Sequence, residues 1–288
     1  MKTKKQQTTI DSAVKRYIPH LKGRNLSYHH TRILLGRIKT FVKAFGDRTF
    51  DSIQKEELEK YIRKMGSPVS QRHHLFAVQS VFKWAKDCDI IPWDRRDVTE
   101  RVVPQKIMPT EPGFFTAEEM TRLLQAACRE PSSHHFILTT LILGGFVGMR
   151  CQEIMRLSWS DILLDHKCVR VSQLITKTGR RRIATLPDNA VAWLHRVGTK
   201  TGRVVPESIV QNFHRETNRV AERAGVVWKP NGLRHSYVTY SMALARNAWE
   251  VSEQVGNSPD VLQAHYKGLV LPSEANEWFA LTPEEVVL

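Results

Sequence analysis

The chain has 288 residues, of which 41% are hydrophobic, and its formal net charge is +14. The length favours two domains over one, and the apolar content suffices for packed cores, which excludes general disorder. No apolar run reaches the about 18 to 20 residues that cross a bilayer, so we expect no membrane partner.

The cysteines and the first residues argue against a secreted protein. Cys88, Cys128, Cys151 and Cys168 show no C-x-x-C spacing, which disfavours a zinc site or a disulfide framework. Residues 1–9 are basic and polar, and no apolar segment follows them, unlike a secretory signal. We therefore expect a reducing, cytoplasmic location.

Positive charge is concentrated in the first part of the chain. Residues 1–105 hold 22 Lys and Arg against 11 Asp and Glu, whereas residues 106–288 hold 21 against 18. This excess suits a polyanion, with nucleic acid as the natural candidate. The alternative is a well-solvated basic protein with no special partner, and charge alone does not say what would be done to the nucleic acid.

Apolar residues recur at helical spacing in four segments of this basic part. The predicted helices cover residues 10–21, 27–45, 52–65 and 70–88, with stops at Gly46 and at 66–68. No alternating strand pattern lies between them, so residues 1–101 are predicted to form a small helical domain.

Basic side chains occupy the outward positions of these helices. The candidates for contacts with DNA phosphates are Arg32, Lys39, Lys43, Arg72 and Lys83. Two pairs of adjacent histidines, at 29–30 and 73–74, do not predict a metal site. Neighbouring helix residues point about 100° apart, and the surrounding cations disfavour a metal ion.

Residues 102–113 contain three prolines and a glycine, as in an extended linker. Thr116 and Glu119 then have capping-box spacing, which predicts a helix from residue 117 to about 127. The second domain is therefore expected to cover residues 114–288.

The apolar segment 135–147 predicts a buried helix that breaks at Gly148. Arg150 would lie in the first turn of the next helix, where its side chain and free backbone N–H groups suit a phosphate. Glu153 would lie on the same face and orient the guanidinium. An ordinary surface ion pair is the alternative.

A small antiparallel sheet is predicted next, from strands at 168–174, 175–177 and 182–187. It would carry Lys177 at a hairpin tip, as a ligand-reaching or merely solvated lysine. Helices are predicted at 188–196, 208–224 and 236–254, with Arg234 before the last of these and Tyr266 after it.

These residues, in this order, resemble the tyrosine recombinase (phage integrase) family over almost the whole chain. The similar segments are G-M-R-C-Q-E at 148–153, L-S-W-S-D-I at 157–162, T-K-T-G at 176–179, L-R-H-S at 233–236 and H-Y at 265–266. V-F-K-W-A at 81–85 resembles a segment near the end of the family's helical core-binding domain. The resemblance implies a mainly α fold with a small antiparallel β-sheet (α+β), made of a core-binding and a catalytic domain.

The resemblance also implies a site-specific recombinase or integrase of mobile genetic elements that works through a 3′-phosphotyrosyl intermediate. Tyr266 would be the nucleophile, Arg150 and Arg234 would bind the phosphate, and Lys177 would be the general acid. The implied partners are double-stranded DNA, a homotetramer on paired sites and accessory DNA-bending proteins, in the nucleoid. The chemistry would need no cofactor and no metal.

Two positions depart from the family pattern. Asn231 and Asn257 stand where the family usually has imidazoles; they could hydrogen-bond a phosphate but could not move a proton at neutral pH. His235 is not expected to be the missing histidine. The alternatives are a catalytically impaired DNA-binding relative, a topoisomerase-like relaxing enzyme and a helical RNA-binding protein. The tail 271–288 could pack on its own domain or on a neighbouring subunit.

Overall fold

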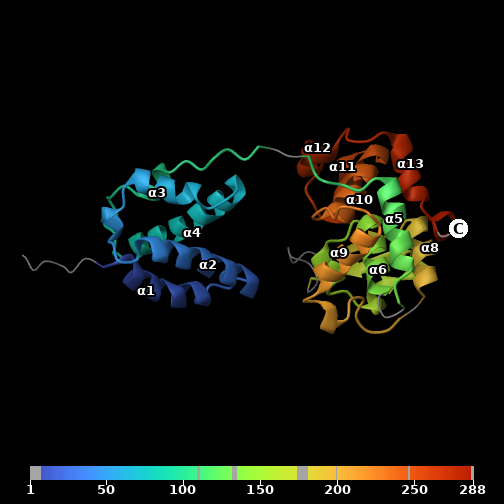
Figure 1. Cartoon of the computed structure of the whole chain (residues 1–288), viewed down its shortest axis with the longest axis horizontal. Coiled ribbons are helices and arrows are strands. Elements are labelled where there is room, and N and C mark those ends of the chain that lie inside the picture. The colour runs from blue at the N-terminus through green and yellow to red at the C-terminus, as the bar shows by residue number, and fades with distance from the viewer. Residues whose placement is uncertain are drawn as a thin grey trace, which may run out of the picture. The chain divides into compact units, whose positions relative to one another are not determined.

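The computed structural model describes residues 8–108, 111–131, 135–173, 181–198, 200–245 and 247–286. The chain divides into two compact units, Met1–Pro109 and Thr110–Leu288 (Figure 1). Both are helical, and unit 2 adds one small antiparallel sheet, which confirms the predicted fold class. The exact domain limits, including the linker at 102–113, stay a prediction. Within the described residues, no helix has both the length and the apolarity to cross a bilayer.

Unit 1 contains the four predicted helices. They are α1 (Ile10–Gly23), α2 (Tyr28–Phe45), α3 (Lys55–Arg63) and α4 (Pro68–Asp87). Hydroxyl oxygens of Thr9, Ser27 and Ser67 accept hydrogen bonds in the first turns of α1, α2 and α4. The apolar faces of the helices meet in one core.

Two helix starts in unit 1 differ from the prediction. Residues Phe50–Ser52 form a 3₁₀ turn, and α3 begins only at Lys55. Phe50 and Ile53 are buried in the core, which holds this segment out of the helix. Helix α4 begins at residue 68 and not 70, because Ser67 caps it and proline suits the first helical position.

Unit 2 is organised around α6 (His135–Gly145), which is buried on all sides from Phe136 onward. Helices α5 (Ala117–Cys128), α8 (Asp188–Val197) and α10 (Gly232–Leu244) pack against it. An almost purely apolar sequence suits such a position. The other helices of unit 2 are α7 (Cys151–Ile154), α9 (Phe213–Arg223), α11 (Ala248–Val255), α12 (Pro259–Tyr266), α13 (Pro272–Ala280) and α14 (Pro283–Val286).

The sheet has the order β1-β2-β3, and both pairs are antiparallel. The strands are β1 (Ile162–Leu163), β2 (Cys168–Val171) and β3 (Arg182–Thr185). Strand β1 was not predicted, because two residues give no alternating pattern. Strand β2 ends before the predicted residue 174, whereas the predicted strand 175–177 and Lys177 lie outside the described residues.

Three predicted helices in unit 2 have different limits. Helix α6 ends at Gly145 and not at 147, and a 3₁₀ turn, Glu207–Ile209, precedes α9 where one helix from 208 was expected. The segment predicted as one helix at 236–254 is two, α10 and α11. The side chain of Asn247 accepts from the backbone N–H groups of Trp249 and Glu250, so it starts a new helix there.

The C-terminal segment packs on its own unit. Trp278 of α13 is fully buried, and its indole N–H donates to the carbonyl oxygen of Gly145 at 3.1 Å. Its ring stacks on Tyr240 of α10 with centroids 4.6 Å apart. The described part of the tail thus packs within unit 2, and docking on a neighbouring subunit stays a prediction.

Candidate functional site

The turn between α6 and α7 depends on Gly148. Its φ of +72° lies in the left-handed region that favours glycine, and a Cβ at this position would collide with the ring of Tyr237. The turn makes Arg150 the N-cap residue of α7. A free backbone N–H was expected at Arg150, as a donor to a phosphate. In the structure this N–H instead donates to Glu153 Oε2 at 2.9 Å.

Glu153 is the buried carboxylate of the site, with only 1% of its side chain exposed. It accepts from Arg150 Nη1 at 3.1 Å and from both Nη atoms of Arg182, at 3.0 and 2.7 Å. Burial alone would raise the pKa of this carboxyl, but the hydrogen bonds and charges of Arg182 and Arg150 outweigh it and lower the pKa. Glu153 therefore orients Arg150, as its spacing predicted, and a second arginine as well.

Arg182 is a site residue that sequence analysis missed as such. Arg182 is the first residue of β3, and its side chain lies on the same inward side of the strand as Ala184. Ile183 points outward and is 68% exposed. Hydrophobicity alone would place the isoleucine inside and the arginine outside. The reversal follows from Glu153, which lies 29 residues earlier and gives the inward guanidinium its partner. The Nε atom of Arg182 also donates to the carbonyl oxygen of Gln254 at 3.0 Å.

Arg234 lies in the first turn of α10 and is 9% exposed. Its guanidinium donates to the carbonyl oxygens of Gly148 and Val255, the latter at 2.7 Å. Burial, and next the charge of Arg150, lower its pKa to about 9, so the group stays protonated at neutral pH.

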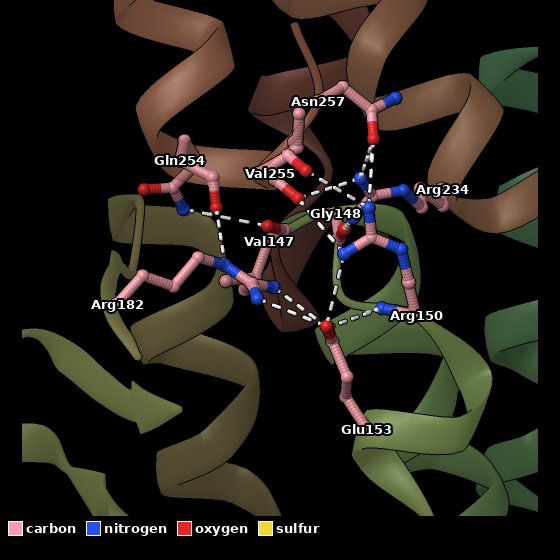
Figure 2. Close-up of polar contacts among 10 residues, drawn as sticks. Val147, Gly148, Arg150, Glu153, Arg182, Arg234, Gln254, Val255 and Asn257 are labelled. Carbon is pink, nitrogen blue, oxygen red and sulfur yellow. Dashed lines mark hydrogen bonds and ion pairs between the residues drawn. The ribbon is translucent and has the colours of Figure 1, made fainter. Parts of the chain in front are cut away.

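Asn257 joins the two arginines that were predicted to bind phosphate. Its Oδ1 atom accepts from Arg150 Nη2 at 2.8 Å and from Arg234 Nη2 at 3.0 Å. Since guanidinium groups only donate, the amide must present its oxygen to them. Figure 2 shows this oxygen above both guanidinium groups, with Arg182 and Glu153 on the other side of Arg150.

Tyr266, the last residue of α12, is 7% exposed. Its hydroxyl lies 2.6 Å from Nδ1 of His235, which follows Arg234 in α10. Burial raises the pKa of the phenol, and the charge of Arg234 opposes this rise only in part. Burial and the charge of Arg234 lower the pKa of His235. His235 is thus a second residue of the site that the sequence alone did not identify, because its partner belongs to another helix.

The remaining candidates lie elsewhere. Asn231 is exposed in a left-handed conformation before α10, with φ of +55°, and its side chain has no hydrogen bond within the described residues. The five predicted DNA-contacting residues are all exposed: Arg32, Lys39, Lys43, Arg72 and Lys83. Lys177 lies outside the described residues.

The chain is similar in sequence to known proteins. Residues 113–253 match the family model described as Phage integrase family. Tyrosine recombinase XerA of Saccharolobus solfataricus is 23% identical over 228 residues, which cover 78% of this chain and 71% of the relative. Tyrosine recombinase XerD of Bifidobacterium longum is 24% identical over 237 residues, covering 72% of this chain and 75% of the relative.

Two solved structures share the fold at low identity. A lambda integrase(75-356) dimer bound to a COC′ core site is 17% identical, with a TM-score of 0.72 over 90% of this chain and 95% of that one. A lambda integrase tetramer bound to a Holliday junction is 16% identical, with a TM-score of 0.73 over 91% of this chain and 78% of that one. Residues 113–253 thus carry the phage integrase family domain, and most of the chain is similar to tyrosine recombinases.

Proposed function

We propose that this chain is a site-specific DNA recombinase or integrase that cleaves and rejoins strands through a 3′-phosphotyrosyl intermediate on Tyr266. The observation that carries the proposal is the convergence of Arg150 and Arg234 on one oxygen, Oδ1 of Asn257. The non-bridging oxygens of a phosphodiester are also acceptors and share one negative charge, so they would bind two guanidinium groups more strongly than a neutral amide does. The amide oxygen marks the position that a non-bridging phosphate oxygen would take between the two guanidinium groups.

In the proposed reaction, the Tyr266 oxygen attacks phosphorus as the bond from phosphorus to the 5′-oxygen breaks. Arg150 and Arg234 would offset the charge that develops on the non-bridging oxygens, and loss of one such donor typically costs about 10²- to 10³-fold in rate. Lys177 would protonate the leaving 5′-oxygen, on the strength of the family resemblance. The reverse reaction with another 5′-hydroxyl would reseal the strand without an external energy source.

The proposed partner is double-stranded DNA, on which lambda integrase occurs as a dimer and, at a Holliday junction, as a tetramer. We infer a homotetramer on paired sites here too, with accessory DNA-bending proteins as further members. The five predicted DNA-contacting cations of unit 1 are all exposed, which supports a role for that unit in holding the duplex.

A catalytically impaired DNA-binding protein is the second candidate. It is favoured by Asn257, which occupies the arginine pair and, like Asn231, cannot transfer a proton at neutral pH. Both candidates bind DNA; only the recombinase forms a covalent bond to it.

Covalent capture separates the two. The substrate is a duplex carrying a short repeat from the boundary of the DNA segment that encodes the chain, nicked so that cleavage releases a small fragment. We expect the wild type to form a protein–DNA adduct that survives denaturing electrophoresis. Tyr266→Phe should form none and bind the duplex with unchanged Kd. Wild-type protein that binds this duplex without any adduct would favour the impaired protein.

A further inference from the structure

The proposed attack leaves one proton without a recipient. Tyr266 must lose its phenolic proton as its oxygen bonds to phosphorus, whereas Lys177 would act at the leaving oxygen. The two positions where the family usually carries imidazoles hold Asn231 and Asn257. The oxygen of Asn257 is engaged by both arginines, and neither amide is basic enough to take a proton.

We propose that His235 is the catalytic base that accepts the phenolic proton of Tyr266. This inference rests on the proposed recombinase function and adds to it the residue that activates the nucleophile. The geometry is a contact of 2.6 Å between Nδ1 of His235 and the hydroxyl oxygen of Tyr266. That is within the range needed for direct proton transfer.

The surrounding packing holds both rings in this relation. The ring centroids lie 5.7 Å apart and the planes are tilted by 30°. Tyr266 is buried with Val238 of α10, Val255 of α11 and Leu262 of α12 in one apolar cluster. Residues of three helices thus enclose the phenol, and its oxygen is directed at the imidazole.

The protonation states suit a transfer from tyrosine to histidine. The raised pKa of Tyr266 keeps the phenol protonated at neutral pH, and the lowered pKa of His235 keeps the imidazole neutral. Nδ1 is then the acceptor and Nε2 carries the ring hydrogen. In the reaction, the bond from Oη to phosphorus forms, the bond to the 5′-oxygen breaks, and the proton moves from Oη to Nδ1. Resealing returns that proton to Tyr266.

The charges around His235 come from few groups. Helices α6, α11, α12 and α13 pack against α10. Among the described residues, the charge that shifts the pKa of His235 is that of Arg234, whereas Glu274 and Glu277 of α13 act on Tyr240. The other titratable groups on these helices are His135, Glu250, Glu253, Asp260 and His265. We therefore expect the pKa of His235 to depend mainly on the charge of Arg234 and on the charge of a phosphate bound beside it.

The test compares His235→Gln with His265→Gln on the nicked suicide duplex. Glutamine can accept a hydrogen bond from Tyr266 but cannot take its proton, so it separates a base from a positioning residue. We expect His235→Gln to lower the rate of adduct formation by about 10²-fold or more, with unchanged DNA affinity. His265 neighbours Tyr266 on α12 but is exposed, so His265→Gln should keep the wild-type rate. Adduct formation by His235→Gln at the wild-type rate would overturn the proposal.

A modified substrate separates the two ends of the reaction. Sulfur in place of the leaving 5′-oxygen departs as a thiolate and needs no acid, because thiols have a pKa of about 8.5. Lys177→Ala should regain its rate on this substrate, whereas His235→Gln should stay slow. Recovery of His235→Gln would instead assign His235 to the leaving group and overturn the proposal.

The wild type supplies a test that does not depend on the variant's folding. Its rate on the sulfur substrate should fall as the pH drops from about 7 to 5, because protonated His235 cannot act as a base. A flat profile across that range, with DNA still bound, would overturn the proposal. No adduct from the wild type at any pH would instead contradict the recombinase function itself.

Discussion

At the scale of single residues, the site depends on a buried carboxylate between two cations. Glu153 accepts from the side chains of Arg150, the N-cap residue of α7, and Arg182 of β3. It also accepts from the backbone N–H of Arg150. Such a group sets the position of the guanidinium that would meet the phosphate. It also leaves two charges unpaired if it is neutralised, because neither arginine can lose its proton.

We therefore expect Glu153→Gln to destabilise the protein by about 3 to 5 kcal/mol at pH 7, as when one partner of a buried ion pair is removed. The pKa of Glu153 is lowered in the folded state, so its contribution is present above the unfolded pKa of about 4.3 and is lost as the pH falls through the folded value. The difference between wild type and variant should shrink on acidification below pH of about 4. Urea denaturation followed by tryptophan fluorescence measures the free energy of unfolding at each pH.

Exposed Glu253→Gln is the control, with an expected change within about 0.5 kcal/mol. Equal stabilities of Glu153→Gln and wild type at pH 7 would contradict this account.

Spacing along one helix predicted only part of this network. Glu153 lies three residues after Arg150, so their pairing follows from helix geometry. Arg182 and His235 could not be assigned in the same way, because each partner lies on a different element. For Arg182 the apolar pattern even favours the wrong face, since Ile183 is the residue that points outward. The sequence therefore did not predict the side chains of this site whose hydrogen-bond partners lie on a different helix or strand.

At the scale of elements, local signals predicted most helices but not the breaks between them. The capping box of Thr116 and Glu119 starts α5 as expected, because both hydrogen bonds form within one turn. The division between α10 and α11 depends on the cap of Asn247, which an apolar pattern does not reveal. It matters for the site because α11 then ends at Val255, whose carbonyl oxygen accepts from Arg234.

Two side chains tie the sheet to α11, Arg182 from β3 and Gln254 from α11. Gln254 accepts from the backbone N–H of Thr185 at 2.9 Å and donates to its carbonyl oxygen at 2.8 Å. Strand β3 is an edge strand of the described sheet, so the amide side chain pairs with backbone groups that β2 does not reach.

Gln254→Ala should therefore loosen β3 while leaving the rest of unit 2 folded. These bonds are exposed to solvent, so each is worth about 1 kcal/mol, and hydrogen exchange over residues 182–186 should become a few-fold faster. Mass spectrometry of that peptide measures the change, with exposed Gln263→Ala of α12 as the matched control. Unchanged exchange in Gln254→Ala would mean that pairing with β2 and the bonds of Arg182 hold β3 without this side chain.

At the scale of the whole molecule, charge and chemistry belong to different units. The candidate site lies entirely in unit 2, whereas the excess positive charge lies in the first 105 residues. Each unit has its own apolar core, so neither needs the other to bury its side chains. If the chain is a recombinase, unit 1 supplies affinity for the duplex and unit 2 supplies the reaction, and substitutions should separate the two properties.

Salt dependence tests this division through Arg72. It is an exposed cation on α4 and stacks over Phe76 at 5.9 Å, with no ion pair to another described residue. Lys15 is also an exposed cation, but Asp11 pairs with it at 2.7 Å. Each phosphate contact contributes about 0.9 to the slope of log K against log salt concentration. In the Tyr266→Phe background, Arg72→Gln should reduce the magnitude of that slope by about one. Lys15→Gln removes the same charge but should leave the slope unchanged. Equal slopes for both variants would mean that unit 1 attracts DNA only through its net charge, without a defined contact at α4.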